Sequence, residues 1–592
     1  MTNVNEGEIE YYNVEEFYRI RYTQTRFYVL NYERRMNQIF RSDNNFLLGT
    51  TGILLGIRDN DVEYLGNDSG NCIAFVQEGE LWCYDRVNNT ISQVFSFRDA
   101  EGINNRENWN QHDISIIRVD EAGSISFVVS GYMNRGEHEG QVGISVYYYD
   151  GISHTVEEEV FIPSNKSYEV LQAELGQLMY VNEQKQLYLM WDSDVYKVNM
   201  NTFEVSVLAK SDSEKCYAIS ESGRYLAWVS PESMYTSREI HLEDLKTGIR
   251  YEVSDIAGGY VLPIDFVGED FVYGVANETD VKENAYGEIV YPMSKVEILN
   301  TGEEKRDVIK SYAPENYKIG DVYVSNNNIY LELVTENNGR LILSGQDTIM
   351  NREIEPANSV KLKKSVTTLK QTQIAINMKE IKKDSAIKVI YPRHILLENA
   401  RTVSMKVNTA GYYYVYARGK VLLATKDAGE AVKCANENVG VVVDANLKYV
   451  YKRARSTTQS TFTNLTVSEA DAHASSLAKA VSIILTREGV GVRVNDLLES
   501  GQTPVQIMQS TLKESTVLEL RDCGVEDVLY YIDQGNPVLV RTGVDKAILL
   551  IGYSSNYIAY YDANSRLSKT CTYEEMASIM EAGDNYFIAY IK

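Results

Sequence analysis

The sequence is poor in the features that nucleic acids and membranes require. It has 58 Lys and Arg residues against 83 Asp and Glu residues, which gives a formal net charge of −25, and no basic cluster reverses this charge locally. It has no continuous run of the ~18–20 apolar residues that would span a bilayer. We therefore expect neither a nucleic-acid partner nor a membrane span.

Cysteine is scarce and has no paired spacing. The six cysteines are Cys72, Cys83, Cys216, Cys434, Cys523 and Cys571. Because no C-x-x-C pair occurs, the spacing predicts neither a zinc site nor a disulfide framework, and free buried thiols are expected. We predict no metal and no cofactor. The sequence also lacks G-x-S-x-G, which excludes a serine hydrolase of the prolyl oligopeptidase kind.

A repeated hairpin pattern fills the chain from about residue 15 to residue 358. Apolar runs are short, alternate with polar residues and end in Asn, Asp, Gly or Ser, which is typical of strands joined by turns. One unit recurs: an alternating strand, an Asp or Asn, a few turn residues and a second alternating strand. Its copies, such as LWCYDRVNNTISQVF, centre on Asp85, Asp150, Asn199, Asp244 and Asn300.

The spacing of these hairpins predicts an all-β propeller in residues 1–358. The separations of 65, 49, 45 and 56 residues are close to the ~40–50 residues of a four-stranded blade with loop insertions. We expect about seven blades closed into a ring, with six or eight as alternatives. Residues 27–40 are expected to supply the outer strands of a blade completed elsewhere in the chain. The pattern resembles WD-like and Tol-type propellers, without their GH…WD signature.

The amino-acid composition of the chain changes after residue 358. Residues 359–455 are expected to hold a Lys-rich segment with a last propeller strand and then a connector, followed by a small β-α-β module of the α+β kind. In that module strand patterns flank a helix pattern at residues 428–436. Residues 455–463, RSTTQSTFT, are typical of a linker.

Residues 465–592 are expected to form an α+β domain. A helix with Leu477, Val481 and Ile484 on one face is followed by a second that begins at Thr503-Pro504 and a third near residues 525–533. Strands follow, and two of them are apolar throughout and therefore buried on both faces. The order GNPVLV, AILLIGY, YIAYYDAN resembles papain-like cysteine peptidases of the bacteriocin-processing type, over about 125 residues.

The resemblance implies a catalytic triad that this chain has lost. The nucleophile motif of the family is similar to C-G-P-A-S-L-A; its S-L-A fits residues 476–478, which places Ala472 at the cysteine and His473 at the glycine. Lys546 falls near the position of the histidine, and a lysine ammonium accepts no proton at neutral pH. Asp562 alone matches the third residue. The resemblance therefore implies a pseudo-peptidase without catalytic residues.

Cys523 is the alternative nucleophile. It lies in Cys-Gly at the head of a predicted helix, where the helix dipole lowers the pKa of a thiol. Its segment matches the third helix of the family rather than the first, and His473 is the only histidine beyond His394. A structural cysteine is favoured, and an active cysteine peptidase that uses Cys523 with His473 stays open.

One loop in the repeat region is rich in polar side chains. Residues 132–141, YMNRGEHEGQ, contain Arg135, Glu137, His138 and Glu139 between two predicted strands. These side chains suit a polar ligand or a cation, although a solvated connection between strands is the commoner role of such a loop. We expect the loop to project from the rim.

Together these patterns predict a non-catalytic binding protein. The propeller would recognise a protein, peptide or glycan, and the peptidase-like domain would keep a groove without turnover. The abrupt start at Met1, followed by an acidic, Tyr-rich segment, is typical of a bacterial ectodomain that has lost an export signal or anchor, so we expect an extracellular or cell-surface location. The alternatives are an active cysteine peptidase and a cytoplasmic assembly scaffold.

Overall fold

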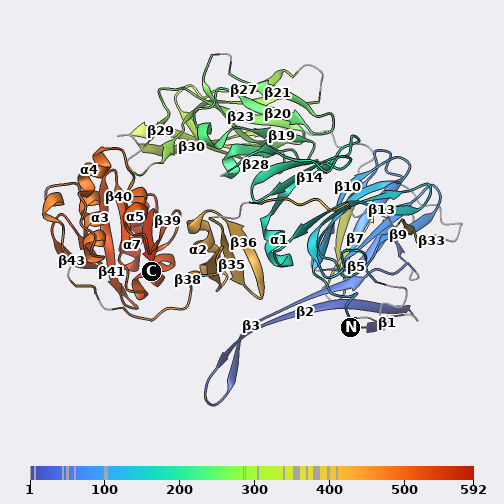
Figure 1. Ribbon diagram of the computed structural model, residues 1–592, viewed down its shortest axis with the longest axis horizontal. Helices are drawn as coiled ribbons and strands as arrows, with labels where there is room; N and C mark the ends of the chain where they lie inside the picture. The colour runs from blue at the N-terminus through green and yellow to red at the C-terminus, as the bar shows by residue number, and fades with distance from the viewer. Residues whose placement is uncertain are drawn as a thin grey trace.

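The protein is a series of antiparallel sheets followed by a mixed α/β part, as the computed structural model shows (Figure 1). The structure describes residues 2–5, 8–42, 46–48, 52–58, 62–98, 105–211, 213–255, 257–283, 286, 288–302, 306–337, 340–350, 360–368, 371–377, 387–395, 401–407, 411–459, 461–463 and 465–592. None of the helices in this part of the chain has the length and apolar character needed to cross a membrane. No disulfide joins any of the six cysteines, all of which lie among the described residues.

Between residues 47 and 377 the described residues contain seven groups of three or four neighbouring antiparallel strands, called here strand groups one to seven. The first is β4 (Leu47–Leu48), β5 (Gly52–Ile57), β31 (Lys361–Val366) and β32 (Thr372–Asn377); the second is β6 (Tyr64–Gly66), β7 (Cys72–Gln77), β8 (Glu80–Asp85) and β9 (Thr90–Phe95); the third is β10 (His112–Val119), β11 (Ile125–Tyr132), β12 (Val142–Asp150) and β13 (Thr155–Ser164). The fourth is β14 (Leu175–Val181), β15 (Gln186–Trp191), β16 (Asp194–Asn199) and β17 (Val205–Ala209); the fifth is β18 (Tyr217–Ile219), β19 (Tyr225–Trp228), β20 (Ile240–Asp244) and β21 (Ile249–Val253). The sixth is β22 (Tyr260–Val267), β23 (Asp270–Ala276), β26 (Met293–Leu299) and β27 (Val308–Tyr312), and the seventh, joined to it through β26, is β28 (Lys318–Ser325), β29 (Asn328–Asn337) and β30 (Arg340–Met350).

The five predicted Asp/Asn turns recur at one place in successive strand groups. Each lies between the third and fourth strands of groups two to six, which confirms the repeat. A short side-chain oxygen accepts a backbone N–H two residues later, so that Asp or Asn closes the turn that Gly or Ala would leave open. These bonds measure 2.8–3.1 Å at Asp85, Asp150, Asn199, Asp244 and Asn300.

The first strand group is completed by a distant part of the chain. β5 pairs with β32, in a register that places Ile53 opposite Ile376, and both side chains are fully buried. Farther along, β33 (Lys388–Ile390) and β34 (Arg393–Ile395) add parallel edge strands to β9 and β13. The sheets therefore extend well beyond residue 358, where the sequence pattern places their end.

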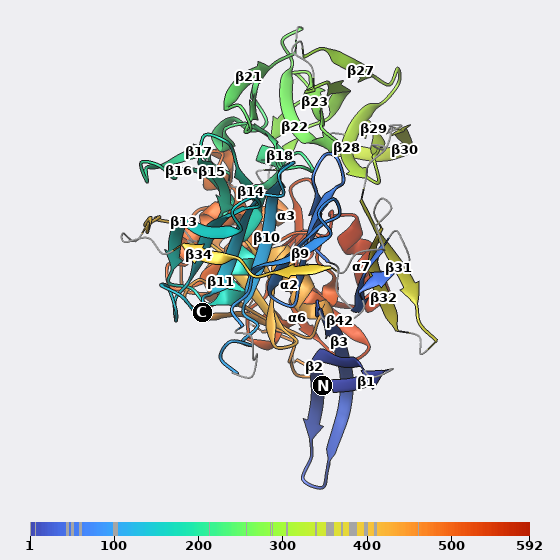
Figure 2. The ribbon, with the colours of Figure 1, turned by 90° about the vertical axis from the view of Figure 1, so that its right-hand side faces the viewer.

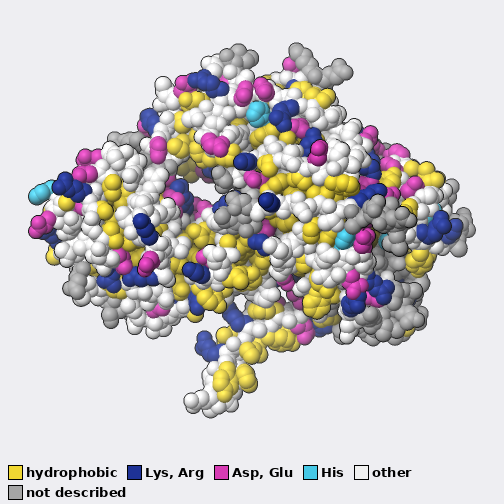
Figure 3. Space-filling model, in the orientation of Figure 1, with side chains coloured by type: hydrophobic (Ala, Val, Ile, Leu, Met, Phe, Trp, Pro, Cys, Tyr) yellow, Lys and Arg dark blue, Asp and Glu magenta, His cyan; other side chains and the backbone are white. Residues whose placement is uncertain are grey.

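Residues 27–40 do not supply the outer strands that were expected of them. They lie mainly in β3 (Phe27–Ile39), which pairs with β2 (Glu8–Tyr22) in a long hairpin, and β1 (Thr2–Asn5) pairs with the start of β2. This hairpin, called the arm below, projects from the body in two perpendicular views (Figures 1 and 2). Hydrophobic side chains lie along it (Figure 3).

Neighbouring strand groups share hydrophobic cores from the first to the seventh. Groups one and two, two and three, three and four, four and five, five and six, and six and seven each have a common cluster of buried side chains. None of the clusters formed by described residues joins group seven to group one. Figure 1 shows an arc in which β5 and β29 lie on opposite sides, so the ring expected from the sequence is not closed by the sheets themselves.

The C-terminal part has two sheets that share one hydrophobic core. The smaller contains β35 (Tyr413–Ala417), β36 (Lys420–Thr425), β37 (Val441–Asp444) and β38 (Tyr449–Lys452), covered by α2 (Ala428–Glu437). The larger has the order β39 (Thr516–Leu520), β44 (Phe587–Ile591), β40 (Val538–Gly543), β41 (Lys546–Tyr553), β42 (Tyr557–Asp562) and β43 (Leu567–Thr572). Because one cluster contains side chains of both sheets, the residues predicted as a separate module and a separate domain pack as one body.

Helices cover both faces of the larger sheet, so its central strands are buried on both sides, as predicted. Side chains of α3 (Ser476–Arg487), α4 (Val494–Glu499) and α5 (Pro504–Thr511) lie on one face. Those of α2, α6 (Val525–Asp533) and α7 (Tyr573–Glu581) lie on the other. Thr503 caps α5 with Pro504 at its first position, which confirms that start. The predicted linker also packs here, because Phe462 N–H donates to the carbonyl of Ile551 at 2.9 Å.

Candidate functional site

A segment of the sixth strand group reaches into the C-terminal body. Between β23 and β26 the chain leaves the sheet and forms the short hairpin β24 (Lys282–Glu283) and β25 (Ile289–Val290). Tyr286, at the turn of this hairpin, is 3% exposed and belongs to the core cluster of α3 and β41. Its hydroxyl donates to the backbone carbonyl of Lys546 at 3.1 Å, and its ring packs edge-on against Tyr586 at 5.0 Å. This hairpin therefore joins the arc of sheets to the C-terminal body.

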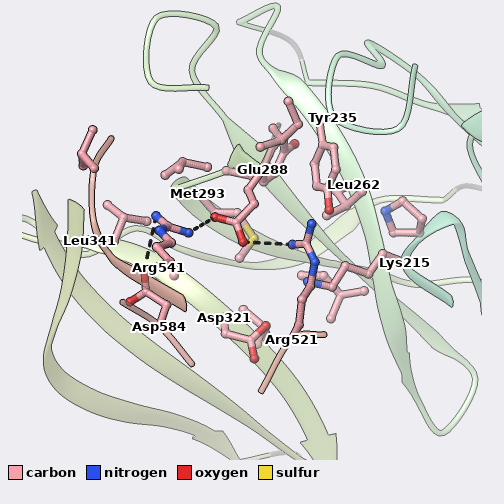
Figure 4. Close-up of a pocket in the computed structure, with 18 residues that line it drawn as sticks. Lys215, Tyr235, Leu262, Glu288, Met293, Asp321, Leu341, Arg521, Arg541 and Asp584 are labelled. Atoms are coloured by element: carbon pink, nitrogen blue, oxygen red, sulfur yellow. Dashed lines mark hydrogen bonds and ion pairs between the residues drawn. The ribbon is translucent and has the colours of Figure 1, made fainter. Parts of the chain in front are cut away.

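A carboxylate on the same hairpin bridges two arginines. Glu288 accepts from Arg521 at 3.2 Å and forms a second ion pair with Arg541. Asp584 lies 3.4 Å from the other end of the Arg541 guanidinium. The side chain of Arg541 is only 5% exposed, whereas that of Arg521 is 40% exposed. Figure 4 shows Glu288 between the two guanidinium groups. A charge as buried as Arg541 requires such partners, because an unpaired one costs several kcal/mol.

These charges line a cavity of about 530 Å³ between the sixth and seventh strand groups and the C-terminal body. Its apolar wall includes Leu262, Ile264, Val290, Met293, Val322 and Leu341. Lys215 and Asp321 add one charge of each sign. A concave site at a domain boundary, with an apolar wall and a few convergent charged groups, is the usual form of a binding pocket. We call it the junction pocket.

The three segments that carry the predicted triad positions meet in the folded chain. The Ser476 hydroxyl at the start of α3 accepts from the N–H of Ala547, beside Lys546, at 3.1 Å. Lys479, in the first turn of α3, donates to Asn564 at 3.0 Å, two residues beyond Asp562. Ala472 itself lies in a short turn before α3.

The chemistry at these positions offers no nucleophile and no base. The side chain of Ala472 is a methyl group, and Lys546 is exposed at the first position of β41. Asp562 pairs with Lys569 at 2.9 Å. Burial raises the pKa of Asp562, but the hydrogen bonds from Lys569, Ser565 and Asn564 outweigh burial and lower this pKa to about 2. Asp562 is therefore engaged with Lys569 and not with the residue at position 546.

A second cavity, of about 430 Å³, lies beside the start of α3. Ser475, Leu477 and Asp545 line it from the C-terminal body, and Glu283 lines it from the inserted hairpin β24–β25. A groove therefore exists near the predicted triad positions, and part of its wall comes from the arc of sheets.

The structure separates the two residues of the alternative catalytic pair. Cys523 is 1% exposed, and its thiol donates to the carbonyl of Gly429 at 3.5 Å, in the core shared with α2. Burial and the nearby Asp527 raise the pKa of Cys523 well above the usual range of a thiol. His473 is exposed beside α3. Among the interactions of the described residues, none joins Cys523 to His473.

The polar loop of residues 132–141 does not gather its four side chains. His138 is 7% exposed, bonded to Glu158 at 2.8 Å, and stacked on Phe161 with ring centroids 3.8 Å apart. Arg135, Glu137 and Glu139 are exposed; Arg135 pairs with Glu107, and Glu139 pairs with Arg106. His138 therefore anchors the loop to its own sheet, while the other three side chains face solvent.

Sequence patterns missed the residues of the junction pocket. Tyr286 and Glu288 lie in the 56-residue interval between Asp244 and Asn300, which is longer than a four-stranded blade needs. This length predicted an inserted segment but not which part of the protein the segment contacts. Arg521 and Arg541 stand at the ends of apolar strands, where an exposed arginine is ordinary. What marks these residues is their pairing with one another across more than 200 positions of the sequence, which only the folded structure shows.

Comparisons with known proteins give no family for the chain. No family model matches it, and no curated protein matches it. Among solved structures, a chain of a mitotic checkpoint complex is 11% identical, covering 58% of this chain and 95% of its own, with a TM-score of 0.25. Hsv2 of Kluyveromyces lactis is 10% identical, covering 54% and 98%, with a TM-score of 0.23. A putative TolB of Agrobacterium tumefaciens is 11% identical, covering 51% and 90%, with a TM-score of 0.19.

These neighbours are β-propellers of the WD40 and Tol types. Because these TM-scores lie below 0.5, the similarity supports no conclusion about this chain. Its own strand pairing shows a mostly β, multidomain protein.

Proposed function

We propose that this chain is a non-catalytic binding protein. Its strand groups act as about seven blades that together form a propeller-like recognition surface. Its C-terminal body is a papain-like peptidase fold without catalytic residues. The junction pocket between the two parts binds a protein or peptide ligand.

One observation carries the non-catalytic assignment: the inserted hairpin contacts the backbone at the start of β41, beside the position of the missing histidine. In the resemblance, the histidine of the triad stands near Lys546, and the backbone carbonyl of Lys546 is bonded to Tyr286. Catalysis by a thiol requires a thiolate within hydrogen-bond reach of a base. Ala472 supplies no thiolate, and the buried Cys523 favours its neutral form.

The test of the non-catalytic assignment is a thiol probe combined with a turnover assay. The full chain is incubated with iodoacetamide and with unstructured fluorogenic peptides, alongside a Cys523→Ala variant. We expect no peptide cleavage, and labelling of Cys523 only after denaturation, because its thiol is buried and protonated. Rapid labelling of native Cys523, together with cleavage that Cys523→Ala abolishes, would instead establish the active peptidase.

The chemistry of the junction pocket favours a ligand with a carboxylate beside an apolar group. Arg521 is 40% exposed and already binds two carboxylates, that of Glu288 at 3.2 Å and that of Glu519 at 2.6 Å, so its guanidinium is placed to bind a ligand carboxylate in exchange for one of them. Guanidinium groups pair with carboxylates through charge-assisted hydrogen bonds, often two at once. The apolar wall of β22, β26 and β28 lies across the pocket and suits an aliphatic or aromatic side chain. A peptide segment with Asp or Glu next to an apolar residue offers both.

This ligand assignment is tested on an array of immobilised eight-residue peptides probed with the labelled full chain. We expect retention of peptides that combine Asp or Glu with an apolar residue. The variant Arg521→Gln should bind them about 10–100-fold more weakly, since a hydrogen bond to a charged group contributes ~1.5–3 kcal/mol. Arg493→Gln is the matched control, because that side chain is 76% exposed and its ion pair within the described residues is with Asp496. Retention of no peptide, or equal binding by both variants, contradicts the assignment.

A further inference from the structure

The arm presents an apolar face to solvent. Its hairpin joins β2 to β3, and three alternate cross-strand pairs occupy one face of its distal half: Tyr18 with Tyr32, Ile20 with Val29, and Tyr22 with Phe27. Residues directly opposite each other in a hairpin point to the same face. These six side chains therefore form one continuous surface, called the arm face, and each exposes between 46% and 68% of its area.

An uncovered surface of this kind is unusual on a hairpin in water. A two-stranded ribbon alone is marginally stable, and contiguous exposed apolar side chains mark a site of contact. The rings of the arm face already stack in pairs, at 4.8 Å for Tyr18–Tyr32 and 5.0 Å for Tyr22–Phe27, so the surface is formed before any partner arrives. The opposite face carries Arg19 with Asn31 and Arg21 with Tyr28, so a single aromatic side chain stands there among polar ones.

The order of the three pairs makes the arm face self-complementary. From base to tip the pairs read aromatic, aliphatic, aromatic, and from tip to base they read the same. A two-fold axis through the Ile20–Val29 pair therefore lays the tip pair of one arm on the base pair of another, with the aliphatic pairs in contact at the centre. A two-fold interface requires that the same patch fit itself in this way. Arg19 and Arg21 remain outside the contact.

We propose that the arm face is the contact of a symmetric dimer, in which the arms of two copies of this chain stack face to face. A fully buried aromatic side chain removes ~150–250 Å² from water. The four aromatic and two aliphatic side chains of the arm face are each about half exposed, so covering them buries on the order of 500–700 Å² per arm. The pair then buries about 1,000–1,400 Å², which reaches the ~1,200 Å² of specific interfaces. The hydrocarbon core of a membrane suits this arm less, because none of the described strands pairs with the outer edges of its distal half, which leaves backbone N–H and C=O groups there.

The first test is the mass of the full chain in solution as a function of concentration, by sedimentation equilibrium. We expect a reversible rise from the 67.1 kDa of one chain toward twice that mass. Val29→Lys, at the centre of the arm face, should keep the chain monomeric, because it places two ammonium groups against each other on the axis. Arg21→Gln, on the opposite face, should leave the dimer intact. Since Val29 is 61% exposed, circular dichroism should show both variants folded.

A cross-link tests the geometry independently of affinity. Ile20→Cys brings two thiols together at the two-fold axis and should give a disulfide-linked dimer under mild oxidation, whereas Arg21→Cys should not. The proposal is overturned if the chain stays monomeric at every concentration, if Val29→Lys remains dimeric, or if both cysteine variants cross-link equally. A monomer that sediments with vesicles of anionic phospholipid would overturn it in favour of a lipid surface.

Discussion

Replacing Tyr286 with alanine is expected to uncouple the arc of sheets from the C-terminal body. The side chain is 3% exposed, packs on Tyr586 and bonds to the carbonyl of Lys546, so its removal leaves a cavity at the contact of two parts of the fold. Truncation of a buried aromatic residue costs ~3–5 kcal/mol. In calorimetry we expect the transition of the C-terminal body to separate from the rest and to fall by about 10 °C.

Two further variants separate the causes of this loss. Tyr286→Phe removes only the hydroxyl and its bond to Lys546, which should cost ~0.5–1.5 kcal/mol. Tyr557→Ala, in the same C-terminal sheet but 53% exposed, should change stability by less than ~0.5 kcal/mol. If Tyr286→Ala unfolds in a single transition at the temperature of the unaltered chain, the hairpin does not couple the two parts.

The junction pocket gives this coupling a functional meaning. Glu288 belongs to the arc of sheets, whereas Arg521 and Arg541 belong to the C-terminal body, and the three side chains form one network. A ligand carboxylate that pairs with Arg521 competes with Glu288 for the same guanidinium. Occupation of the pocket and the strength of the junction are therefore linked through one side chain, and a ligand that binds only the joined form stabilises it.

Short-range chemistry was predicted well from the sequence. The Asp and Asn turns followed from the reach of a short side chain to the N–H two residues ahead, which needs no tertiary context. The start of α5 followed from Thr503-Pro504 for the same reason. The short helix α4 was missed because its six residues contain too few turns to show a periodic apolar face.

Long-range pairing was not predictable by the same means. Tyr286 meets Lys546 across 260 positions, and Glu288 meets Arg541 across 253. The alternation that indicates a strand carries no information about which strand lies beside it, because the period of two is shared by all strands. For this reason β3 was expected in a blade and lies in the arm, and the ring was expected to close where the sheets leave an arc.

The resemblance to papain-like peptidases predicts where the triad positions lie in the chain but not which residues surround them. It placed Ala472, Lys546 and Asp562 on three segments that meet around the start of α3 and β41. It could not indicate that a hairpin from the sixth strand group bonds to the backbone carbonyl of Lys546, because that hairpin belongs to another part of the chain. Nor could it indicate that Asp562 pairs with Lys569. The assignment of these positions as a lost triad stays a prediction.

Replacing Ile376 with aspartate is expected to unfold the first strand group. Ile376 is fully buried in β32, opposite Ile53 of β5, in the core that groups one and two share. A carboxylate placed in this cluster of buried apolar side chains loses its hydration, so we expect a loss of more than ~4 kcal/mol. Trp82, 3% exposed in the same core, should become accessible, which acrylamide quenching of tryptophan emission measures.

The matched control lies on the neighbouring strand. Val366, the last residue of β31, is 72% exposed, so Val366→Asp introduces the same charge into water and should change stability by less than ~0.5 kcal/mol. A difference between the two variants follows only if residues 361–377 complete the first strand group, since a free connector would tolerate aspartate at either position. Equal quenching in both variants would show that the sheets end before residue 361.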